Sequence, residues 1–257
     1  GSEMCIRDRY KDVKTRKRAS VGNTCAKALD RVRGEKSPIA EAGDAEEGVD
    51  VTPFFVKAKE MLEDIEKSSK KCSSDYEKTQ VWSTMGYVYF ALDDIPGAAI
   101  YYRKIVDSDG AEPEFRLDTR LTLGQFYAAM EKYEMAIEQY EIWAEAAFVV
   151  GAQERLTMAQ LYYQLERKDD SLRSVKLGIS EAEAKGILPK ESFWSLGTAL
   201  YNEKNQMDEV IDYLEKLVTH YPKWKYWKQL GGMFGAQERM TDQLVAYEVI
   251  YLNGELT

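Results

Sequence analysis

The chain is poor in the residues that most often carry catalysis and metal binding. It has one histidine, His220, and three cysteines among its 257 residues. It contains no H-E-x-x-H, no G-x-S-x-G, no Walker loop and no pair of C-x-x-C motifs. One histidine and scattered carboxylates are a poor ligand set for a metal ion. We therefore predict no catalytic, cofactor-binding or metal-binding residues, and we do not expect the chain to be an enzyme.

Long apolar runs and an excess of positive charge are also missing. No stretch approaches the roughly 18 apolar residues of a membrane span, so no membrane span is predicted. The net charge is −9, whereas binding of nucleic acid requires a clustered positive surface. The sequence therefore argues against nucleic acid as the main partner.

What the sequence does contain is an internal repeat. A small residue followed three positions later by an aromatic one, or by their near equivalents, recurs at Gly86/Tyr89, Gly124/Tyr127, Ala159/Tyr162, Thr198/Tyr201 and Gly231/Phe234. A second series follows twelve residues after each small residue, at Ala98, Ala136, Ser171, Val210 and Gln243. The steps, of about 33 to 39 residues, bracket the roughly 34-residue period of tetratricopeptide repeats.

Two series in constant phase predict a helix–turn–helix unit stacked on copies of itself. The first helix of each unit places its small residue where the neighbouring helix comes close, and the second helix buries residues such as Ala98 and Ala136. We predict an all-α fold, a right-handed superhelix of tetratricopeptide repeats with about five to six helix pairs. A surface for binding follows from such a stack more readily than an active site does.

The expected domain boundaries are as follows. Residues 1–13 form a leader outside the fold, because Gly1-Ser2 resembles a cloning scar and residues 3–9 resemble a translated sequencing adapter. Residues 14–257 form the repeat domain. Its divergent leading unit, 14–73, has a first helix at about 20–33 and a mobile acidic loop at 34–50; the clearer repeats occupy 74–257.

Cys25 and Cys72 lie near the start of the first helix and the end of the second helix of the leading unit. These places are neighbours in an antiparallel pair, so a disulfide is geometrically open to them. The sequence leaves an alternative equally open, with one part-buried and one exposed thiol.

The candidate binding surface is the concave face that the first helices build. One helical face away from the packing positions carries amides and aromatic rings, which suit an extended peptide backbone and apolar or proline side chains. The predicted groove residues are Gln80, Ser83, Tyr87, Phe90, Leu121, Gln125, Gln160, Tyr163, Gln164, Ser195 and Asn202. Any stack of repeats has some residues on this face, so the set is a hypothesis. Because it lacks the basic clamp that binds chaperone C-termini, we expect a weakly charged segment instead.

Three stretches of sequence resemble a particular group within the tetratricopeptide repeat proteins. They are residues 76–89 (YEKTQVWSTMGYVY), 161–165 (LYYQL) and 220–230 (HYPKWKYWKQL). Together they resemble a group of proteobacterial repeat proteins encoded beside TonB, ExbB and ExbD components. The similarity covers nearly everything after about Lys14. Half of each motif is generic repeat chemistry, and the export signal that the group carries is not seen at the start of this sequence.

The resemblance implies a function and a compartment. It points to a non-enzymatic protein-interaction scaffold in the periplasm, accessory to TonB-dependent transport across the outer membrane, with a protein or an extended peptide segment of a TonB-system component as partner. The alternative is a cytoplasmic adaptor or assembly factor, or an outer-membrane lipoprotein scaffold for envelope enzymes.

Overall fold

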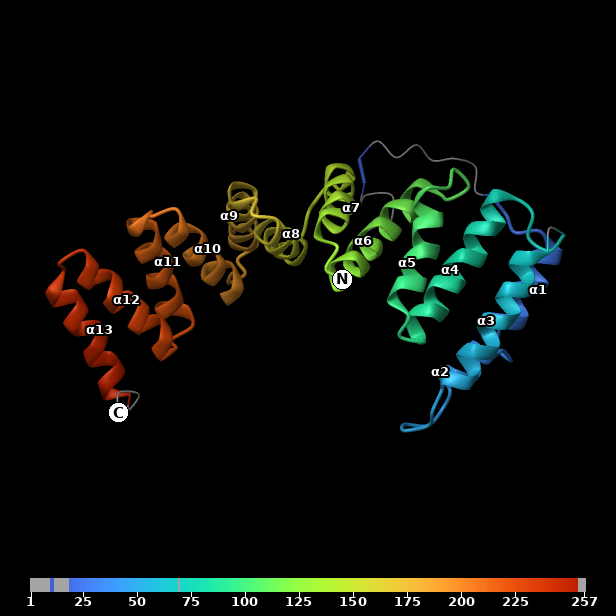
Figure 1. Cartoon of the computed structure of the whole chain (residues 1–257), viewed down its shortest axis with the longest axis horizontal. Helices are drawn as coiled ribbons and strands as arrows, with labels where there is room; N and C mark the ends of the chain where they lie inside the picture. The colour runs from blue at the N-terminus through green and yellow to red at the C-terminus, as the bar shows by residue number, and fades with distance from the viewer. Residues whose placement is uncertain (1–9, 12–18, 69, 254–257) are drawn as a thin grey trace. The chain divides into compact units, whose positions relative to one another are not determined.

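The structure is a computed structural model that describes residues 10–11, 19–68 and 70–253. Thirteen α-helices occupy this part of the chain (Figure 1). In order they are α1 (Asn23–Arg33), α2 (Pro38–Gly43), α3 (Thr52–Lys67), α4 (Asp75–Ala91), α5 (Ile95–Val106), α6 (Pro113–Ala129), α7 (Tyr133–Ala146), α8 (Ala152–Gln164), α9 (Lys168–Ala184), α10 (Glu191–Glu203), α11 (Met207–His220), α12 (Trp224–Ala236) and α13 (Met240–Leu252).

The helices form two compact units, residues 1–149 and residues 150–257. The first unit holds α1 to α7 and the second holds α8 to α13. Within each unit a first helix turns back into a second helix, and the five pairs α4/α5, α6/α7, α8/α9, α10/α11 and α12/α13 correspond to the five repeats read in the sequence. The all-α, paired architecture predicted from the sequence is therefore confirmed.

The turn inside every pair has the same backbone. One residue adopts positive φ in each of the five turns: Asp93, Glu131, Glu166, Asn205 and Glu238. The next residue donates its backbone N–H to the carbonyl oxygen of the aromatic residue that marks the repeat, as Lys132 does to Tyr127 at 2.8 Å. This hydrogen bond closes the end of the first helix in the Schellman manner. The marker aromatic therefore also defines where each first helix ends.

Local sequence signals start several helices. The Ser74 side chain accepts from the backbone N–H of Glu77, and the Glu77 carboxylate accepts from the backbone N–H of Ser74, which together form a capping box. Proline occupies the first turn of α2, α3, α5 and α6, where its missing N–H has no helical partner to lose.

In the first unit, glycine provides the close contact between paired helices. A Cβ atom on Gly86 would lie 2.3 Å from the ring of Tyr102, and one on Gly124 would lie 2.9 Å from the ring of Tyr140. Ala98 and Ala136 on the second helices are fully buried, as expected. The small residues of the two marker series therefore do pack between helices here.

The fourth repeat departs from this pattern. Gly197, one residue before the predicted Thr198, faces the ring of Tyr213, at 2.1 Å from an added Cβ. Thr198 is only half-buried, and its hydroxyl donates to the Trp194 carbonyl oxygen. The contact has moved by one residue because the aromatic ring on α11 has moved with it.

The leading unit also differs from expectation. Residues 34–50 were expected to be a loop, but Ser37 caps the short helix α2, and Pro38 at its start is buried. The rest of this acidic stretch is turn. Tyr10, assigned from the sequence to the leader, is buried in the first unit, where its hydroxyl contacts Asp118 and accepts from Trp143 Nε1. Residues 1–9 and 12–18 lie outside the described residues.

Cys25 and Cys72 are joined by a disulfide with their Cα atoms 4.8 Å apart. Cys25 lies in the first turn of α1 and Cys72 precedes α4, so the bond connects the two ends of the leading unit. Both residues are buried, in the same core cluster as Leu29, Leu62 and Met85. Cys5 lies outside the described residues.

Candidate functional site

The predicted groove residues divide between the two units. Six belong to the first unit: Gln80, Ser83, Tyr87, Phe90, Leu121 and Gln125. Five belong to the second: Gln160, Tyr163, Gln164, Ser195 and Asn202. Each group is described within its own unit.

In the first unit the predicted residues form an aromatic surface. The side chains of Tyr87 and Phe90, one helical turn apart on α4, are 46% and 53% exposed. Each ring also meets a neighbouring helix: Tyr87 packs edge-on against Phe55 of α3, and Phe90 stacks on Phe126 of α6 with ring centroids 5.5 Å apart. These rings therefore hold adjacent repeats together as well as facing solvent.

On α8 of the second unit, Gln160 and Gln164 are exposed, whereas Tyr163 is half-buried against the core. The Tyr163 hydroxyl donates to Glu203 of α10 at 2.8 Å. This hydrogen bond, with burial, raises the pKa of Tyr163. Lys168 completes the group with an ion pair to Glu203 at 2.8 Å. Tyr163 thus has a hydrogen-bond partner within the unit, whereas the amide groups of Gln160 and Gln164 face solvent.

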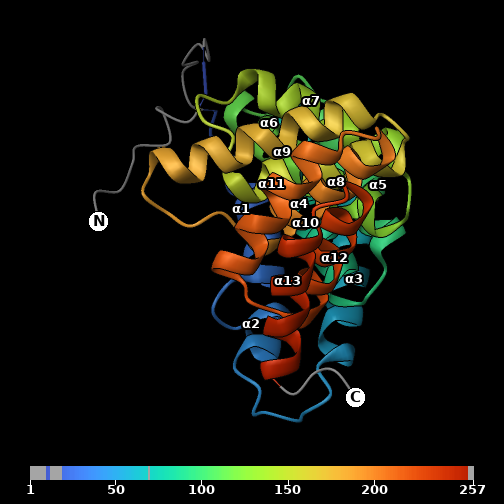
Figure 2. The ribbon, with the colours of Figure 1, turned by 90° about the vertical axis from the view of Figure 1, so that its left-hand side faces the viewer.

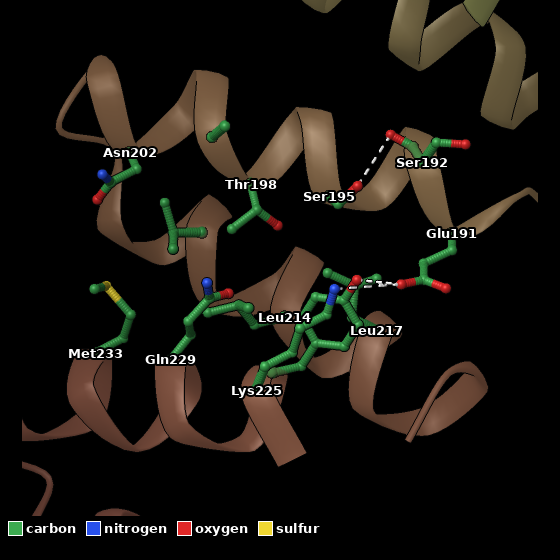
Figure 3. Close-up of a pocket in the computed structure, with 13 residues that line it drawn as sticks. Glu191, Ser192, Ser195, Thr198, Asn202, Leu214, Leu217, Lys225, Gln229 and Met233 are labelled. Atoms are coloured by element: carbon green, nitrogen blue, oxygen red, sulfur yellow. Dashed lines mark hydrogen bonds and ion pairs between the residues drawn. The ribbon is translucent and has the colours of Figure 1, made fainter. Parts of the chain in front are cut away.

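A cavity lined in part by the predicted groove residues Ser195 and Asn202 lies between α10 and α12 and has a volume of about 660 Å³. Figure 3 shows Thr198 and Asn202 of α10 on one side and Gln229 and Met233 of α12 on the other. Its floor is Val210, Leu214 and Leu217 of α11, whose side chains are almost completely buried by their neighbours. We call this cavity the α10–α12 pocket. It combines an apolar floor with amide and hydroxyl groups on its walls.

Charge at the α10–α12 pocket is confined to one end, where one carboxylate lies beside two lysines. The Glu191 carboxylate accepts from Lys223 Nζ at 2.6 Å and from the Tyr226 hydroxyl. Lys225 Nζ lies 3.9 Å from the same carboxylate (Figure 3). The hydrogen bond from Lys223, followed by that from Tyr226, lowers the pKa of Glu191. Burial is the main cause of the raised pKa of Tyr226. Glu191 is therefore held as a carboxylate near neutral pH, and the rest of the lining is uncharged.

The sequence analysis found one wall of this pocket and missed the other. Ser195 and Asn202 were predicted, whereas the α12 wall, Tyr226, Gln229 and Met233, was not. A signal was available, because these three residues lie at offsets of three and four and so share one helical face. The pattern along α12 does not indicate that this helical face lies opposite α10.

Two other cavities were found in the first unit. One of about 670 Å³ lies along α5 and the start of α7, with Ile100, Met130 and Met135 among its lining. A smaller one of about 360 Å³ lies beside Cys72 and Trp82. Within the described ranges, no group of three or more His, Cys, Asp or Glu side chains has the arrangement of a metal site. In those same ranges no helix has the length and apolarity needed to cross a membrane.

Comparison with known proteins identifies the fold. Residues 191–223, which span α10 and α11, match the tetratricopeptide repeat family. No curated protein matches the sequence.

Several solved structures share the architecture at low sequence identity. A crystal structure of MamA protein is 16% identical, with a TM-score of 0.55, over 67% of this chain and 89% of that one. YrrB, described as a TPR protein with an unusual peptide-binding site, is 12% identical with a TM-score of 0.53, over 79% and 93%. A tetratricopeptide repeat protein from Parabacteroides merdae ATCC 43184 is 13% identical with a TM-score of 0.52, over 90% and 80%. These likenesses show that the chain has a tetratricopeptide fold, which is typical of protein-interaction scaffolds.

Proposed function

We propose that the chain is a periplasmic scaffold that binds an extended, weakly charged segment of a TonB-system component in the α10–α12 pocket. The observation that carries the binding step is the lining itself. The half-buried side chains of Ala199 and Met233, beside the buried floor of the pocket, can contact a proline or aliphatic side chain. Asn202 and Gln229 can hydrogen-bond a peptide backbone. Because Glu191 already has two lysine partners, the pocket offers no unpaired carboxylate to a basic segment.

Two further considerations support the compartment and the partner. A disulfide between Cys25 and Cys72 would persist in an oxidising compartment such as the periplasm. The resemblance of residues 76–89, 161–165 and 220–230 to repeat proteins encoded beside TonB components suggests that system as the source of the bound segment. The geometry of the pocket supports the binding of a peptide. The resemblance is the basis for proposing which protein contains that peptide segment.

The proposal predicts the effect of removing the two wall amides. Synthetic peptides covering the periplasmic segment of the cognate TonB should bind the intact chain with roughly micromolar affinity, as transient contacts do. Asn202→Ala with Gln229→Ala should weaken that binding by about tenfold, because each amide loses hydrogen bonds to the peptide. Isothermal titration measures both values.

The comparison variant is Gln160→Ala with Gln164→Ala, which removes two exposed amides of the predicted groove that lie outside the pocket, on α8 of the same unit. This pair should leave the affinity unchanged. If instead the α8 pair weakens binding and the pocket pair does not, the segment runs along α8 and the pocket is not the site. If no component of the TonB system binds the parent chain, the proposed partner is wrong, and a cytoplasmic adaptor or a lipoprotein scaffold becomes the better hypothesis.

A further inference from the structure

The cavity of about 670 Å³ in the first unit has apolar side chains along one part of its lining. Helix α6 packs on both α5 and α7, and the three helices can be followed in Figures 1 and 2. The apolar part consists of Pro96 and Ile100 of α5, Met130 at the end of α6 and Met135 of α7. Ile100 and Met135 are 60% and 37% exposed. We call this cavity the α5–α7 pocket, and its described lining includes none of the predicted groove residues.

The charged side chains that line the α5–α7 pocket are mainly basic. They are Arg103, Lys104 and Lys132, and among the described residues of the lining the one carboxylate is that of Asp107. Asp107 accepts from Arg103 Nε at 2.7 Å, and Lys104 pairs with Glu66 of α3 at 2.8 Å. Two of the three cations are thus paired, and Lys132 leaves the lining positive in a chain whose net charge is −9.

Two arginines of α6 extend this positive charge at the Arg103 end of the pocket. Arg116 Nη1 lies 3.5 Å from the carbonyl oxygen of Ser108, which lines the pocket. Arg120, one helical turn later, is half-buried and donates to the Gln139 side-chain oxygen at 2.8 Å. Burial, followed by repulsion from Arg116, lowers the pKa of Arg120. Because a guanidinium has five N–H donors, Arg120 can donate to a further, negatively charged acceptor.

The carboxylates around these two arginines do not balance them. Asp107 is already paired, and Asp109, 3.5 Å from Arg116 Nη1, is fully exposed to solvent, where an ion pair contributes little. Asp107 and Glu138 of α7 act against the lowering of the Arg120 pKa. Among the described residues, however, no carboxylate forms an ion pair with Arg120. Arg120 therefore lacks the charged partner that a cation removed from water normally has.

The arrangement of the apolar and basic parts suits a peptide. Ile100 and Arg103 are three residues apart on α5, a rise of about 4.5 Å, and Arg116 lies at the end of the pocket beyond Arg103. In an extended chain, side chains two residues apart point the same way and are separated by about 6.6 Å. An apolar and an acidic side chain two positions apart can therefore contact both parts together, whereas a free anion would leave the apolar part unused.

We propose that the α5–α7 pocket binds an extended acidic peptide segment in which a large apolar residue and an Asp or Glu lie two positions apart. The apolar side chain contacts Ile100 and Met135, and the carboxylate accepts from Arg116 and Arg120, since arginine binds carboxylates with strong, charge-assisted hydrogen bonds. This site belongs to the first unit, takes a charged segment and does not depend on the function proposed for the α10–α12 pocket.

A labelled peptide with the repeated unit Leu-Ser-Glu-Ser tests the proposal by fluorescence anisotropy. It should bind the intact chain with a Kd on the order of 10⁻⁵–10⁻⁴ M, and more weakly as the salt concentration rises. Arg116→Gln with Arg120→Gln should weaken binding by at least about tenfold, because charge-assisted hydrogen bonds are lost. Ile100→Gln, at an exposed position where folding should stay intact, should weaken it by about threefold to tenfold through the lost apolar contact.

Lys27→Gln with Arg31→Gln is the matched control, because it removes the same charge from exposed positions four residues apart on α1. Val56→Gln, at an exposed apolar position of α3, is the control for Ile100→Gln. Both controls should change the affinity by less than about twofold, within the usual effect of a surface substitution. Absence of peptide binding, or equal binding by the arginine variant and its control, overturns the proposal. Equal binding of a Ser-Ser-Glu-Ser peptide would show that the site takes an anion alone, which also overturns it.

Discussion

Gly124 leaves no room for a side chain where α6 meets α7. The ring of Tyr140 that faces it is itself 2% exposed and cannot move aside. Gly124→Leu should therefore lower the free energy of unfolding by about 1–3 kcal/mol through overpacking, despite the better helix propensity of leucine. Thermal and urea denaturation of the two proteins measure the difference.

Gly232 provides the control for this prediction. It is also inside a helix, but an added Cβ would meet nothing within 4 Å. Gly232→Leu should stabilise the chain by about 0.5–1 kcal/mol, because only the helix propensity changes. Equal effects of the two substitutions would contradict the assignment of Gly124 to the helix contact.

Glu77 holds three backbone groups at the start of α4. Its carboxylate accepts from the N–H of Gly22 at 2.9 Å and from those of Ser73 and Ser74 at 3.0 Å. The Ser74 bond, followed by those of Gly22 and Ser73, lowers the pKa of Glu77 against the opposing effect of burial. A lowered folded pKa means that the stabilisation is present above the ordinary glutamate pKa and is lost as the pH falls through the folded value.

Glu77→Gln should consequently cost about 1–2 kcal/mol of unfolding free energy at pH 7. The difference from the parent should shrink as the pH falls below the ordinary glutamate pKa of about 4.3 and toward the lowered pKa of folded Glu77. Urea denaturation at a series of pH values measures it. Glu114→Gln, in the first turn of α6, is the control and should have little effect. A cost that does not depend on pH would show that charge is not what Glu77 contributes.

At the scale of the element, the turn between paired helices is strained in every repeat. All five positive-φ turn residues carry side chains, and none is glycine. A left-handed conformation costs an L-residue roughly 1–2 kcal/mol, which glycine largely avoids. The repeats keep these turns because the hydrogen bond to the marker aromatic closes the first helix.

Glu131→Gly should accordingly stabilise the chain, by about 0.5–1 kcal/mol after the entropy cost of glycine is subtracted. Glu131 is exposed, with φ of 57°. Glu134→Gly, three residues later inside α7, should instead destabilise by about 1 kcal/mol. Thermal denaturation of both variants tests the pair, and a loss of stability in Glu131→Gly would count against relief of strain at this turn.

At the scale of the whole molecule, each unit has its own core and its own candidate surfaces. The first unit has the disulfide and the aromatic surface of Tyr87 and Phe90, and the second has the α10–α12 pocket. Variants that alter only the first unit can therefore serve as controls for binding at the second unit.

The disulfide gives a prediction for the intact chain. In protein exported to the periplasm, Cys25 and Cys72 should be unreactive to thiol labels until a reductant is added under denaturing conditions, because they are bonded and buried. Reduction, or Cys25→Ser with Cys72→Ser, should lower the unfolding free energy of the first unit by about 3–4 kcal/mol. The unfolded chain gains conformational entropy when the disulfide no longer closes the loop between the two cysteines. Labelling in a Cys5→Ser background, read by mass spectrometry, tests this. Two reactive thiols in native exported protein would reject the bond and weaken the case for the periplasm.

The helical repeat, its phase and the tight contacts at Gly86 and Gly124 could be predicted from the amino-acid sequence. Gly86 and Gly124, with Ala98 and Ala136 twelve residues later, could be identified because residues three and four apart share a helix face. Each repeat also contains the same pattern at the same spacing. The helix start at Ser74 and Glu77 can be predicted from the sequence because a capping box is an interaction between residues three positions apart.

Only the tertiary structure decided which surfaces face one another. Helix α2, the shift of the glycine contact to Gly197, the stacking of Phe90 on Phe126 and the α12 wall of the pocket all depend on residues from a neighbouring element. Spacing along one helix indicates which side chains share a face. It does not indicate which residues of the next helix meet that face, since the meeting depends on the packing of both.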